Sequence, residues 1–568
     1  MRYIFCVCCL FFVGLSYTIE VDPFLLVVGD ISTSHIRVLH ELVDSSSSNY
    51  FSCLFKDGES PPMTCNEWNT MEKPQIIEYS SLESSSEYKS CFSTKNIQTI
   101  DDCSSFIKVR TFKTNENQLN FTVVSCNRYI EDRDSYMWNK LQQSHDNQEI
   151  HSGTFHVGDQ IYADKIPSQF ISQYSKDENT CIPFLKLVNH FRSYYRDTWN
   201  HPAMYSTLRL GPNWMIPDDH ELMNNANPEF WNLTVSPKPI HLTTDVVKFF
   251  MRAGFQSFLE YQYSLYQNPP NLPNVDQCCV LGSNEDDNCD NIWKEYDDTI
   301  IDFLKFKGLN IFKRIGNTEI IMLDTRYERT LLDENSKSEN HPWLGDDQYL
   351  RFNSKMDTIS NDNTIDNILI FTGMPVYFAS NSMARLAYSV EGEKYASHPD
   401  LDIDLKHFLS KLFDSNNWNK ISLISGDLHM YFEGYICDSY SSKCISQVIS
   451  SGMTIGSTSL HNSATYLYYI ITFGLTRPYL FTDNYTFTTK YDSIFLANNY
   501  LILDINNDNI IYRSYWRPLI TKKDILLHWI FDNNYWILVT FLITIPTLVI
   551  LLCLKKRTNR NSNKKKLN

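Results

Sequence analysis

Six short apolar runs, each ending abruptly in a cluster of polar residues, constrain the fold of this chain more than any other feature. In chain order they are LNFTVV (119–124), TFHV (154–157), NWMI (213–216), TEIIML (318–323), NILIF (367–371) and KISLI (420–424), followed by SCN, GDQIY, PDDHE, DTR, TGMP and SGDLH. Uninterrupted apolar runs of this length are typical of strands covered on both faces. In open α/β sheets, the loops at the carboxyl ends of the strands converge on one crevice. We therefore expect the polar clusters to meet at a single site.

Longer amphipathic segments separate these runs and predict helices outside the sheet. FLKLVNHFRSYYRDTW (184–199) and AGFQSFLEYQYSLYQ (253–267) carry apolar residues at helical spacing. Residues 20–115 instead alternate β-branched and polar residues between serine-rich turns, which predicts a small all-β domain of short strands. Four cysteines are expected to staple this domain: Cys53, Cys65, Cys91 and Cys103.

Both ends of the chain carry apolar segments that predict targeting and membrane insertion. Residues 1–16 have the layout of a cleaved secretory signal, with an uncleaved anchor as the alternative. Residues 536–554 contain no charged residue and would span about 28 Å as a helix, close to the thickness of a bilayer core. The basic tail, residues 555–568, is expected in the cytosol, which predicts a single-pass type I protein facing the lumen or the outside. Its final KKLN fits either a retrieval signal for the endoplasmic reticulum or a basic anchor for anionic headgroups.

The cysteine count indicates one cysteine with a separate role. Eleven of the fifteen cysteines lie outside the predicted signal and membrane segments. An odd number in an oxidising compartment leaves one cysteine unpaired or paired between chains. If Cys126 is set aside as a metal ligand, ten remain for five disulfides; the alternative is that Cys126 is a small buried residue. Three sequons predict glycosylation, at Asn120, Asn232 and Asn484.

The acidic composition limits the class of ligand. With a formal net charge of −16, the chain lacks the basic balance of a general nucleic-acid-binding protein. Phosphate chemistry remains compatible with this charge if bound cations supply the positive charge at the site.

The GDQIY cluster has residues with the chemistry of metal ligands. Asp159 follows a glycine, where a sharp turn can expose a carboxylate suited to hard cations. Tyr162 could bind as a phenolate, but only to a strongly Lewis-acidic ion such as ferric iron, because its free pKa is about 10. Taken alone, the cluster indicates a turn with a packed tyrosine more readily than a metal site. Nearby, His156 is expected in the strand core, and Asp164 is expected to cap or orient the following segment.

Two further clusters place an acid close to a histidine. Asp219 and His220 are adjacent, so that one can face a metal while the other faces substrate; a hydrogen-bonded turn is the alternative. Asp427 and His429 alternate, so both can point to one side if the chain stays extended there. Read together with the other strand ends, these residues predict a metal-dependent active site.

The ordered series SCN, GDQIYAD, DDHE, LDTR and SGDLH resembles the alkaline phosphatase D family, the PhoD-like metallophosphatases. The connecting segments YRDTWNHPAMYSTLRLGPNWMIPDDHE and GNTEIIMLDTRYERT are also similar to that family, and the resemblance covers residues 20–510. GDQIY in addition resembles the GDxxY of the related purple acid phosphatases. The resemblance implies a mixed α+β and α/β fold. A small N-terminal β-sandwich domain (20–115) would precede two packed sheets flanked by helices (118–515) and the C-terminal transmembrane helix.

The resemblance also implies a binuclear or larger metal site and a set of ligands for it. Asp159 would bridge two metals, and a ferric ion would be completed by Cys126, Tyr162 and His429. The second metal would be bound by Asp219 and Asp427. Because oxygen ligands favour a hard ion, calcium is expected at the second position, with zinc, manganese and magnesium as alternatives.

The same resemblance assigns catalytic and substrate-binding roles. His220 would donate a proton to the leaving group and would be oriented by Glu221. Asn127 would contact the substrate. Arg326 would either clamp phosphate oxygens or form a surface salt bridge.

The predicted function is that of a metal-dependent phosphoesterase. It would hydrolyse phosphate monoesters or diesters by in-line attack of a metal-bound hydroxide. The substrate would be a small phosphate ester or a phospholipid headgroup, the latter favoured by membrane tethering. A catalytically inactive, disulfide-rich surface receptor or adhesion protein on the same fold is the alternative.

Overall fold

The structure is a computed structural model of the 568-residue chain. It describes residues 23–43, 49–69, 73–129, 135–146, 151–174, 181–224, 226, 244–281, 289–329, 342–391, 394–455, 479–481, 486–495, 497–507 and 509–517. The predicted signal at 1–16 and the basic tail at 555–568 lie outside these residues.

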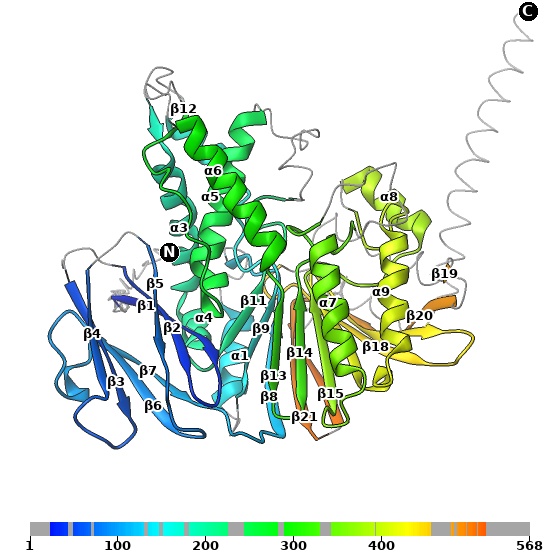
Figure 1. Ribbon diagram of the computed structural model, residues 1–568, viewed down its shortest axis with the longest axis horizontal. Coiled ribbons are helices and arrows are strands. Elements are labelled where there is room, and N and C mark those ends of the chain that lie inside the picture. Colours follow the sequence, from blue (N-terminus) through cyan, green and yellow to red (C-terminus); the bar gives the residue numbers. More distant parts are fainter. Residues whose placement is uncertain are drawn as a thin grey trace, which may run out of the picture.

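The N-terminal part is a pair of antiparallel sheets, drawn in blue in Figure 1. One has the order β1-β2-β5 (Phe24–Ile31, Ile36–Leu42, Gln75–Tyr79), and the other β4-β3-β6-β7 (Thr64–Asn69, Asn49–Lys56, Glu87–Ser93, Ser105–Arg110). The ring of Phe24 packs against those of Tyr50 and Phe92 across the two sheets, which makes the pair a sandwich. Disulfides Cys53–Cys65 and Cys91–Cys103 staple the second sheet. The predicted N-terminal β-rich region is thus present.

Two larger sheets follow the sandwich. The first has the order β11-β9-β8-β21-β22 (Asn213–Ile216, Gly153–Val157, Gln118–Val124, Asn499–Asn506, Asn509–Trp516). The second has the order β13-β14-β15-β16-β18-β17-β20-β19 (Ile311–Ile315, Thr318–Leu323, Asn367–Thr372, Ile421–Ser425, Cys444–Ser450, Tyr431–Asp438, Thr486–Phe495, Tyr479–Phe481). All six apolar runs are strands: β8, β9 and β11 in the first sheet, and β14, β15 and β16 in the second.

The two larger sheets pack face to face, which is why their strands are apolar throughout. Phe155 of β9 stacks on Phe371 of β15, with ring centroids 4.2 Å apart. Side chains alternate along a strand, so Ile320 and Met322 of β14 share the core with the first sheet, whereas Ile321 joins the core beneath the helices. Both faces of these strands are therefore covered, as the apolar runs predict.

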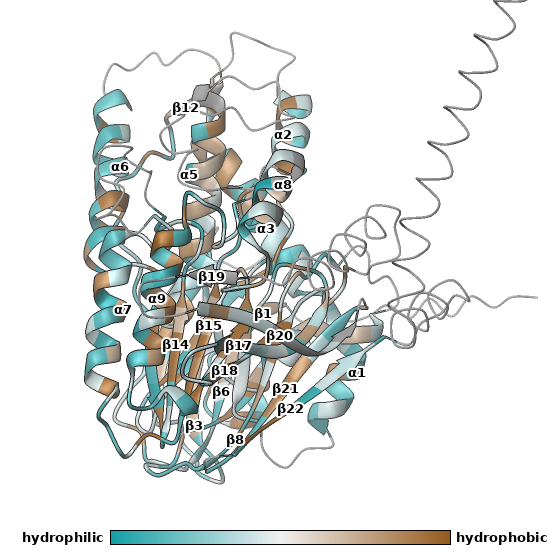
Figure 2. Cartoon of the chain, turned by 90° about the vertical axis from the view of Figure 1, so that its right-hand side faces the viewer, coloured by the Kyte–Doolittle hydropathy of each residue, from teal (hydrophilic) through white to brown (hydrophobic). Residues whose placement is uncertain are grey.

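Helices cover the outer faces of the sheets. They are α1 (Tyr136–Asp146), α2 (Ile166–Tyr174), α3 (Phe184–Trp199), α4 (Pro202–Leu208), α5 (Thr244–Tyr261), α6 (Cys289–Phe306), α7 (Asp346–Ile359), α8 (Asn381–Glu391) and α9 (Asp402–Asp414), with 3-10 turns η1 (Ile100–Asp102), η4 (Tyr263–Leu265) and η5 (Trp418–Lys420). A short ladder, β10 with β12 (Ile182–Pro183, Cys279–Leu281), lies among them. Figure 2 shows apolar strands inside and polar helix faces outside. The helix predicted at 184–199 is confirmed, whereas the one predicted at 253–267 begins earlier, at Thr244, and ends at Tyr261.

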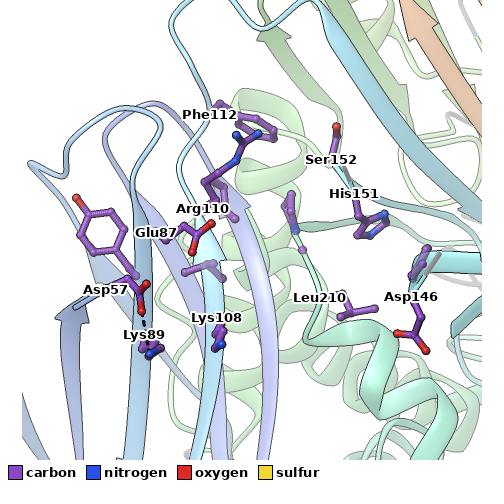
Figure 3. A pocket seen from close by; sticks show the side chains of 16 residues that line it. Asp57, Glu87, Lys89, Lys108, Arg110, Phe112, Asp146, His151, Ser152 and Leu210 are labelled. Carbon is purple, nitrogen blue, oxygen red and sulfur yellow. Dashed lines mark ion pairs between the residues drawn. The ribbon is translucent and has the colours of Figure 1, made fainter. Parts of the chain in front are cut away.

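The sandwich and the larger sheets share one continuous core. Phe24 of β1 belongs to the same apolar cluster as Phe121 of β8 and Phe155 of β9. On another side the two parts are separated by a polar cavity of about 410 Å³ (Figure 3). Lys89 and Lys108 lie on its sandwich wall and His151 on the opposite wall.

The expected single-pass membrane placement is contradicted. Within the ranges described above, no helix combines the length and the apolar composition needed to cross a bilayer. The segment on which the expectation rested, residues 536–554, lies outside the described residues.

Candidate metal centre

The carboxyl ends of four strands bring the predicted ligands together. β8, β9 and β11 run parallel in one sheet, and β15 and β16 run parallel in the other. Cys126 follows β8, Asp159 follows β9, Asp219 follows β11, and Asp427 and His429 follow β16. The convergence predicted for these clusters is confirmed, because the potential ligand atoms of these residues fall into groups within 4.8 Å of one another.

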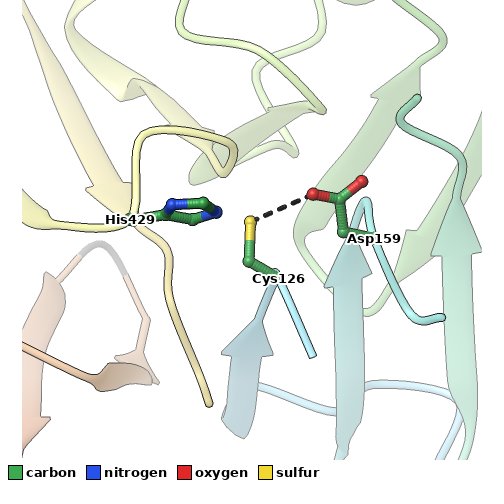
Figure 4. Close-up of side chains that lie close together, drawn as sticks. All are labelled: Cys126, Asp159 and His429. Carbon is green, nitrogen blue, oxygen red and sulfur yellow. Dashed lines mark hydrogen bonds between the residues drawn. The ribbon is translucent and has the colours of Figure 1, made fainter. Parts of the chain in front are cut away.

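The first ligand group contains Cys126, Asp159 and His429, and Figure 4 shows the thiol between the imidazole and the carboxylate. The Cys126 thiol donates to Asp159 Oδ2 at 3.3 Å. Tyr162 lies at the same place, since its hydroxyl donates to Asp159 Oδ2 at 3.2 Å and lies 3.3 Å from His429 Nε2. The four side chains predicted around a ferric ion therefore surround one point.

Two further groups overlap with the first. Asp159, Asp219 and His220 form the second, and Asp218, Asp219 and Asp427 form the third. Asp159 is shared by the first and second groups, and Asp219 by the second and third. Such sharing is what a site for more than one cation requires, because one carboxylate can bridge two ions.

Four of the ligand residues have left-handed backbone conformations. The φ angles are 57° at Cys126, 59° at Asp159, 70° at Asp427 and 50° at His429, four of the nine described non-glycine residues with positive φ. Positive φ is uncommon outside glycine, and such strain persists where surrounding structure enforces it, often at functional sites. The extended conformation assumed for Asp427 and His429 is therefore wrong. Their side chains reach different ligand groups because the backbone turns sharply between them.

The donor set fits a cation. Burial raises the pKa of the Cys126 thiol to about 11. Burial, and then the charge of Cys126, raises the pKa of Asp159 well above its usual range. Burial, and then the charge of Asp159, does the same for Tyr162. A thiol, a phenol, a carboxylate and an imidazole converge at a largely buried site, so a bound cation is the partner that would keep the acidic groups charged.

His220 is oriented by Asp164, and not by Glu221 as predicted. Its Nδ1 lies 2.8 and 2.9 Å from the two carboxylate oxygens of Asp164. Burial lowers the pKa of His220, but the negative charges of Asp219, Asp159 and Asp164 outweigh it and hold this pKa well above its usual value. Asp164 also accepts a hydrogen bond from the backbone N–H of Asn224 at 2.8 Å, which joins the loop after β9 to the loop after β11. Capping of the segment that follows Asp164 stays a prediction.

Glu221 instead connects the loops after β9 and β11 through hydrogen bonds. Its carboxylate accepts hydrogen bonds from the backbone N–H groups of Asp159, Gln160 and Asp218, at 3.2, 2.7 and 2.9 Å. Because adjacent residues point in different directions, Glu221 faces these amides while His220 faces the accessible side. Burial raises the pKa of Glu221 to about 7.

Arg326 is not on the surface, and its contact with phosphate stays a prediction. It is 2% exposed, and it pairs with Asp218, with Asp219 at 3.4 Å and with Asp427 at 3.5 Å. The surface salt bridge is therefore wrong, and the guanidinium is engaged with the third ligand group. Asp218 was not among the predicted ligands, although the doublet in PDDHE is the signal that could have indicated it.

Asn127 also turns inward. Its carboxamide accepts from Trp138 Nε1 at 2.9 Å and donates to the backbone oxygen of Gln160 at 3.4 Å. Contact with substrate stays a prediction, and the observed bonds tie the loops after β8 and β9 together.

The prediction of five disulfides and one unpaired cysteine is confirmed, whereas one predicted glycosylation site is contradicted. Among the described residues, ten cysteines form five disulfides and Cys126 is free and buried. Asn120 is 7% exposed, and its carboxamide donates to Asp504 of β21, so the nitrogen that would carry a glycan is taken up within the sheet. Asn232 and Asn484 lie outside the described residues.

Comparison with known proteins identifies the family of this chain. The family model of PhoD-like phosphatases matches residues 121–469, more than half of the chain. A solved structure of PhoD is 13% identical and has a TM-score of 0.54, with 88% of this chain and 90% of that chain covered. A purple acid phosphatase from yellow lupin (Lupinus luteus) seeds is 8% identical with a TM-score of 0.46, covering 89% and 76%. Among curated proteins, no relative matches. The chain belongs to the PhoD-like phosphatase family and is a hydrolase of phosphoric esters.

Proposed function

We propose that this chain is a metal-dependent phosphoesterase that hydrolyses small phosphate monoesters or diesters at the centre described above. The observation that carries the proposal is the overlap of three largely buried ligand groups, with His220 at their accessible edge. When bound, the cations supply an activated water and neutralise charge on the phosphoryl oxygens. The alternative of an inactive receptor finds no supporting observation in the described part of the chain.

The donor types divide the centre into two positions. Cys126, Tyr162 and His429 offer a thiolate, a phenolate and an imidazole, a set suited to ferric iron. On the other side, Asp219 and Asp427 offer oxygen, which suits a hard divalent cation such as calcium. Asp159 would bridge the two positions, since it belongs to both the first and the second ligand group.

His220 is the proton donor that this geometry supports. Its side chain is 15% exposed, and its Nδ1 is held by Asp164, so the other ring nitrogen is left to face a leaving group. The carboxylate of Asp164 at Nδ1 favours the protonated imidazole, as a general acid requires.

Arg128 is the cation placed to hold phosphoryl oxygens. It follows β8 by four residues, and its guanidinium carbon lies 5.8 Å from the centroid of the Tyr162 ring, with both side chains half-buried. Because Arg326 is engaged with carboxylates, Arg128 takes over the substrate contact predicted for it. The planar guanidinium fork of an arginine can contact two phosphate oxygens at once.

The experiment combines metal content with two esters. The purified chain is analysed for iron and calcium and assayed with p-nitrophenyl phosphate and bis-p-nitrophenyl phosphate. Asp159→Asn is expected to lose at least a hundredfold in turnover, whereas Asp146→Asn, an exposed acid outside the centre, is expected to match wild type. A metal-loaded protein that releases nitrophenol from neither ester would refute the proposal.

A spectroscopic measurement tests the ligand assignment separately. Iron bound by Tyr162 would give a tyrosinate-to-iron absorption band in the visible range, and this band is expected to vanish in Tyr162→Phe. An iron-loaded wild-type protein without the band would show that Tyr162 is not a ligand, whatever its activity.

A further inference from the structure

Arg326 is built into the carboxylate side of the centre. Its Nε pairs with Asp218, and its Nη2 lies 3.4 Å from Asp219 Oδ1 and 3.5 Å from Asp427 Oδ1. The side chains of Arg326 and Asp218 are 2% and 1% exposed. An arginine that binds substrate phosphate needs donors on the accessible side, and this fork points into the ligand group instead.

The turn that carries Arg326 is held by hydrogen bonds to the side chain of Asp324. Asp324 accepts hydrogen bonds from the backbone N–H groups of Arg326, Tyr327 and Glu328, at 3.0, 2.8 and 2.6 Å. The hydroxyl of Tyr327 donates to the backbone oxygen of Asp218 at 2.7 Å. The guanidinium is therefore held in register with the loop that carries Asp218 and Asp219, and it cannot swing toward a substrate without breaking this turn.

Charge counting then indicates what Arg326 does. The group of Asp218, Asp219 and Asp427 carries three negative charges when ionised, and Arg326 brings the sum to two. We propose that Arg326 is a built-in counter-cation that matches this group to one divalent cation and disfavours a trivalent one. The inference rests on the metal centre of the proposed function and adds a determinant of cation choice.

The physical reason is that ligand charge sets cation preference. Cation affinity in oxygen sites is tuned by the number of charged ligands and the rigidity of the site. Three carboxylates without a counter-charge would favour a trivalent ion by their excess charge, and they would repel one another when the site is empty. A fixed guanidinium offsets one of the three negative charges of the carboxylates. It does so at every pH at which the protein is folded, because arginine stays protonated. The position that takes the harder, more highly charged ion is thereby left to the Cys126 side.

The test measures cation preference and not activity. Metals are removed from the full chain by chelation, and Ca²⁺ and Tb³⁺ are titrated separately, with protein-sensitised luminescence reporting Tb³⁺. Ion binding that is present in wild type and lost in Asp427→Asn is assigned to the group of Asp218, Asp219 and Asp427. In Arg326→Gln, the preference for Tb³⁺ over Ca²⁺ is expected to rise at least tenfold, whereas Arg326→Lys, which keeps the charge, should stay within threefold of wild type.

A neighbouring arginine provides the control for a loosened turn. Arg329 lies in the same turn, but its donors contact Met374 Sδ and the backbone oxygen of Lys394, at 2.9 and 3.2 Å. Arg329→Gln should therefore leave the ratio of the two affinities unchanged. If Arg326→Gln does not fold, Asp218→Asn makes the opposite charge change and should lower the preference for Tb³⁺ at least tenfold.

Four outcomes would overturn the inference. An unchanged affinity ratio in Arg326→Gln is the first, and an equal shift in Arg326→Lys or Arg329→Gln is the second. Loss of both ions from a folded Arg326→Gln would show a scaffold and not a charge effect. Unchanged ion binding with a raised KM would restore the phosphate-clamp role. A wild-type chain that binds neither ion would instead refute the metal centre itself, so the two failures are distinguishable.

Discussion

At the scale of single residues, the orientation of His220 and the support of the surrounding loops belong to two different acids. Glu221 is adjacent to His220, but its carboxylate accepts hydrogen bonds from backbone amides. Asp164, in the loop after β9, is the acid that contacts the imidazole. Hydrogen bonds to a general acid fix its tautomer and orientation. The Asp164–His220 pair is therefore the unit expected to deliver the proton.

This pair predicts a dependence on the leaving group. Asp164→Asn should lower kcat about 10–100-fold for an alkyl phosphate, the range typical when an orienting partner is removed. The loss should be several-fold smaller for p-nitrophenyl phosphate, because nitrophenolate leaves without full protonation. Steady-state kinetics on both esters measure the difference.

The double variant sharpens this test. Adding Asp164→Asn to His220→Asn should cause little further loss, since the orienting acid then has no imidazole to hold. Equal losses on the two esters, or additive effects of the two changes, would argue that Asp164 acts only on the stability of the loop.

At the scale of elements, the site is made by abrupt strand endings. Strand β9 ends at Val157, and Gly158 has a φ of 97°, which turns the chain so that Asp159 faces the ligands. A Cβ at Gly158 would lie 2.5 Å from Asp218 Cβ, so the turn also determines how closely the loops after β9 and β11 approach. This glycine is therefore required both by its backbone angle and by its neighbour.

Two glycine substitutions separate these requirements. Gly158→Ala should combine about 1–2 kcal/mol of left-handed strain with a further 1–3 kcal/mol from the collision, and it should reduce bound metal because Asp218 must move. Gly58→Ala is the matched control, since Gly58 has a φ of 77° but nothing within 4 Å of its Cβ position, and should show only the strain. Urea unfolding and metal analysis measure both effects. Equal losses in stability, with full metal content in both proteins, would contradict the close approach.

At the scale of the whole molecule, one buried acid ties the sandwich to both larger sheets. Asp30 of β1 accepts from Trp214 Nε1 of β11 at 2.8 Å and pairs with Lys313 of β13 at 2.7 Å. Burial alone would raise the pKa of Asp30, but the charge of Lys313 and hydrogen bonds from His35, Lys313 and Trp214 hold it below its usual range. The ionised form thus stabilises the joint between the parts.

Asp30→Asn should therefore destabilise the chain by about 2 kcal/mol at pH 7, because it leaves the Lys313 side chain, which is only 14% exposed, without its counter-charge. The folded pKa is depressed, so this contribution is present above the unfolded value of about 3.8 and is lost as the pH falls below it. The difference between wild type and variant in urea unfolding should accordingly shrink in acid. Asp57→Asn, which breaks an ion pair whose acid is 48% exposed, should cost less than about 1 kcal/mol. A pH-independent difference at Asp30 would show that the charge does not matter.

Most of the residues that gather at the centre could be predicted from the sequence, although Asp218 was missed. Apolar runs report burial on both faces, and polar clusters at their ends report the site, because strand endings in such sheets share one edge. The ligands Cys126, Asp159, Tyr162, Asp219, Asp427 and His429 all come together on this basis. The odd cysteine count likewise predicted one unpaired cysteine, and the structure shows that it is Cys126.

Tertiary structure alone decided how these residues face one another. Side-chain direction depends on backbone angles that the sequence does not display, and left-handed turns at Asp427 and His429 sent their side chains to different ligand groups. Contacts across long sequence distances are equally invisible in the chain order: Asp164 to His220, and Arg326 to Asp218, each join separate loops. Residue type and position therefore predicted the membership of the centre, whereas the packing of the two sheets assigned each member its partner.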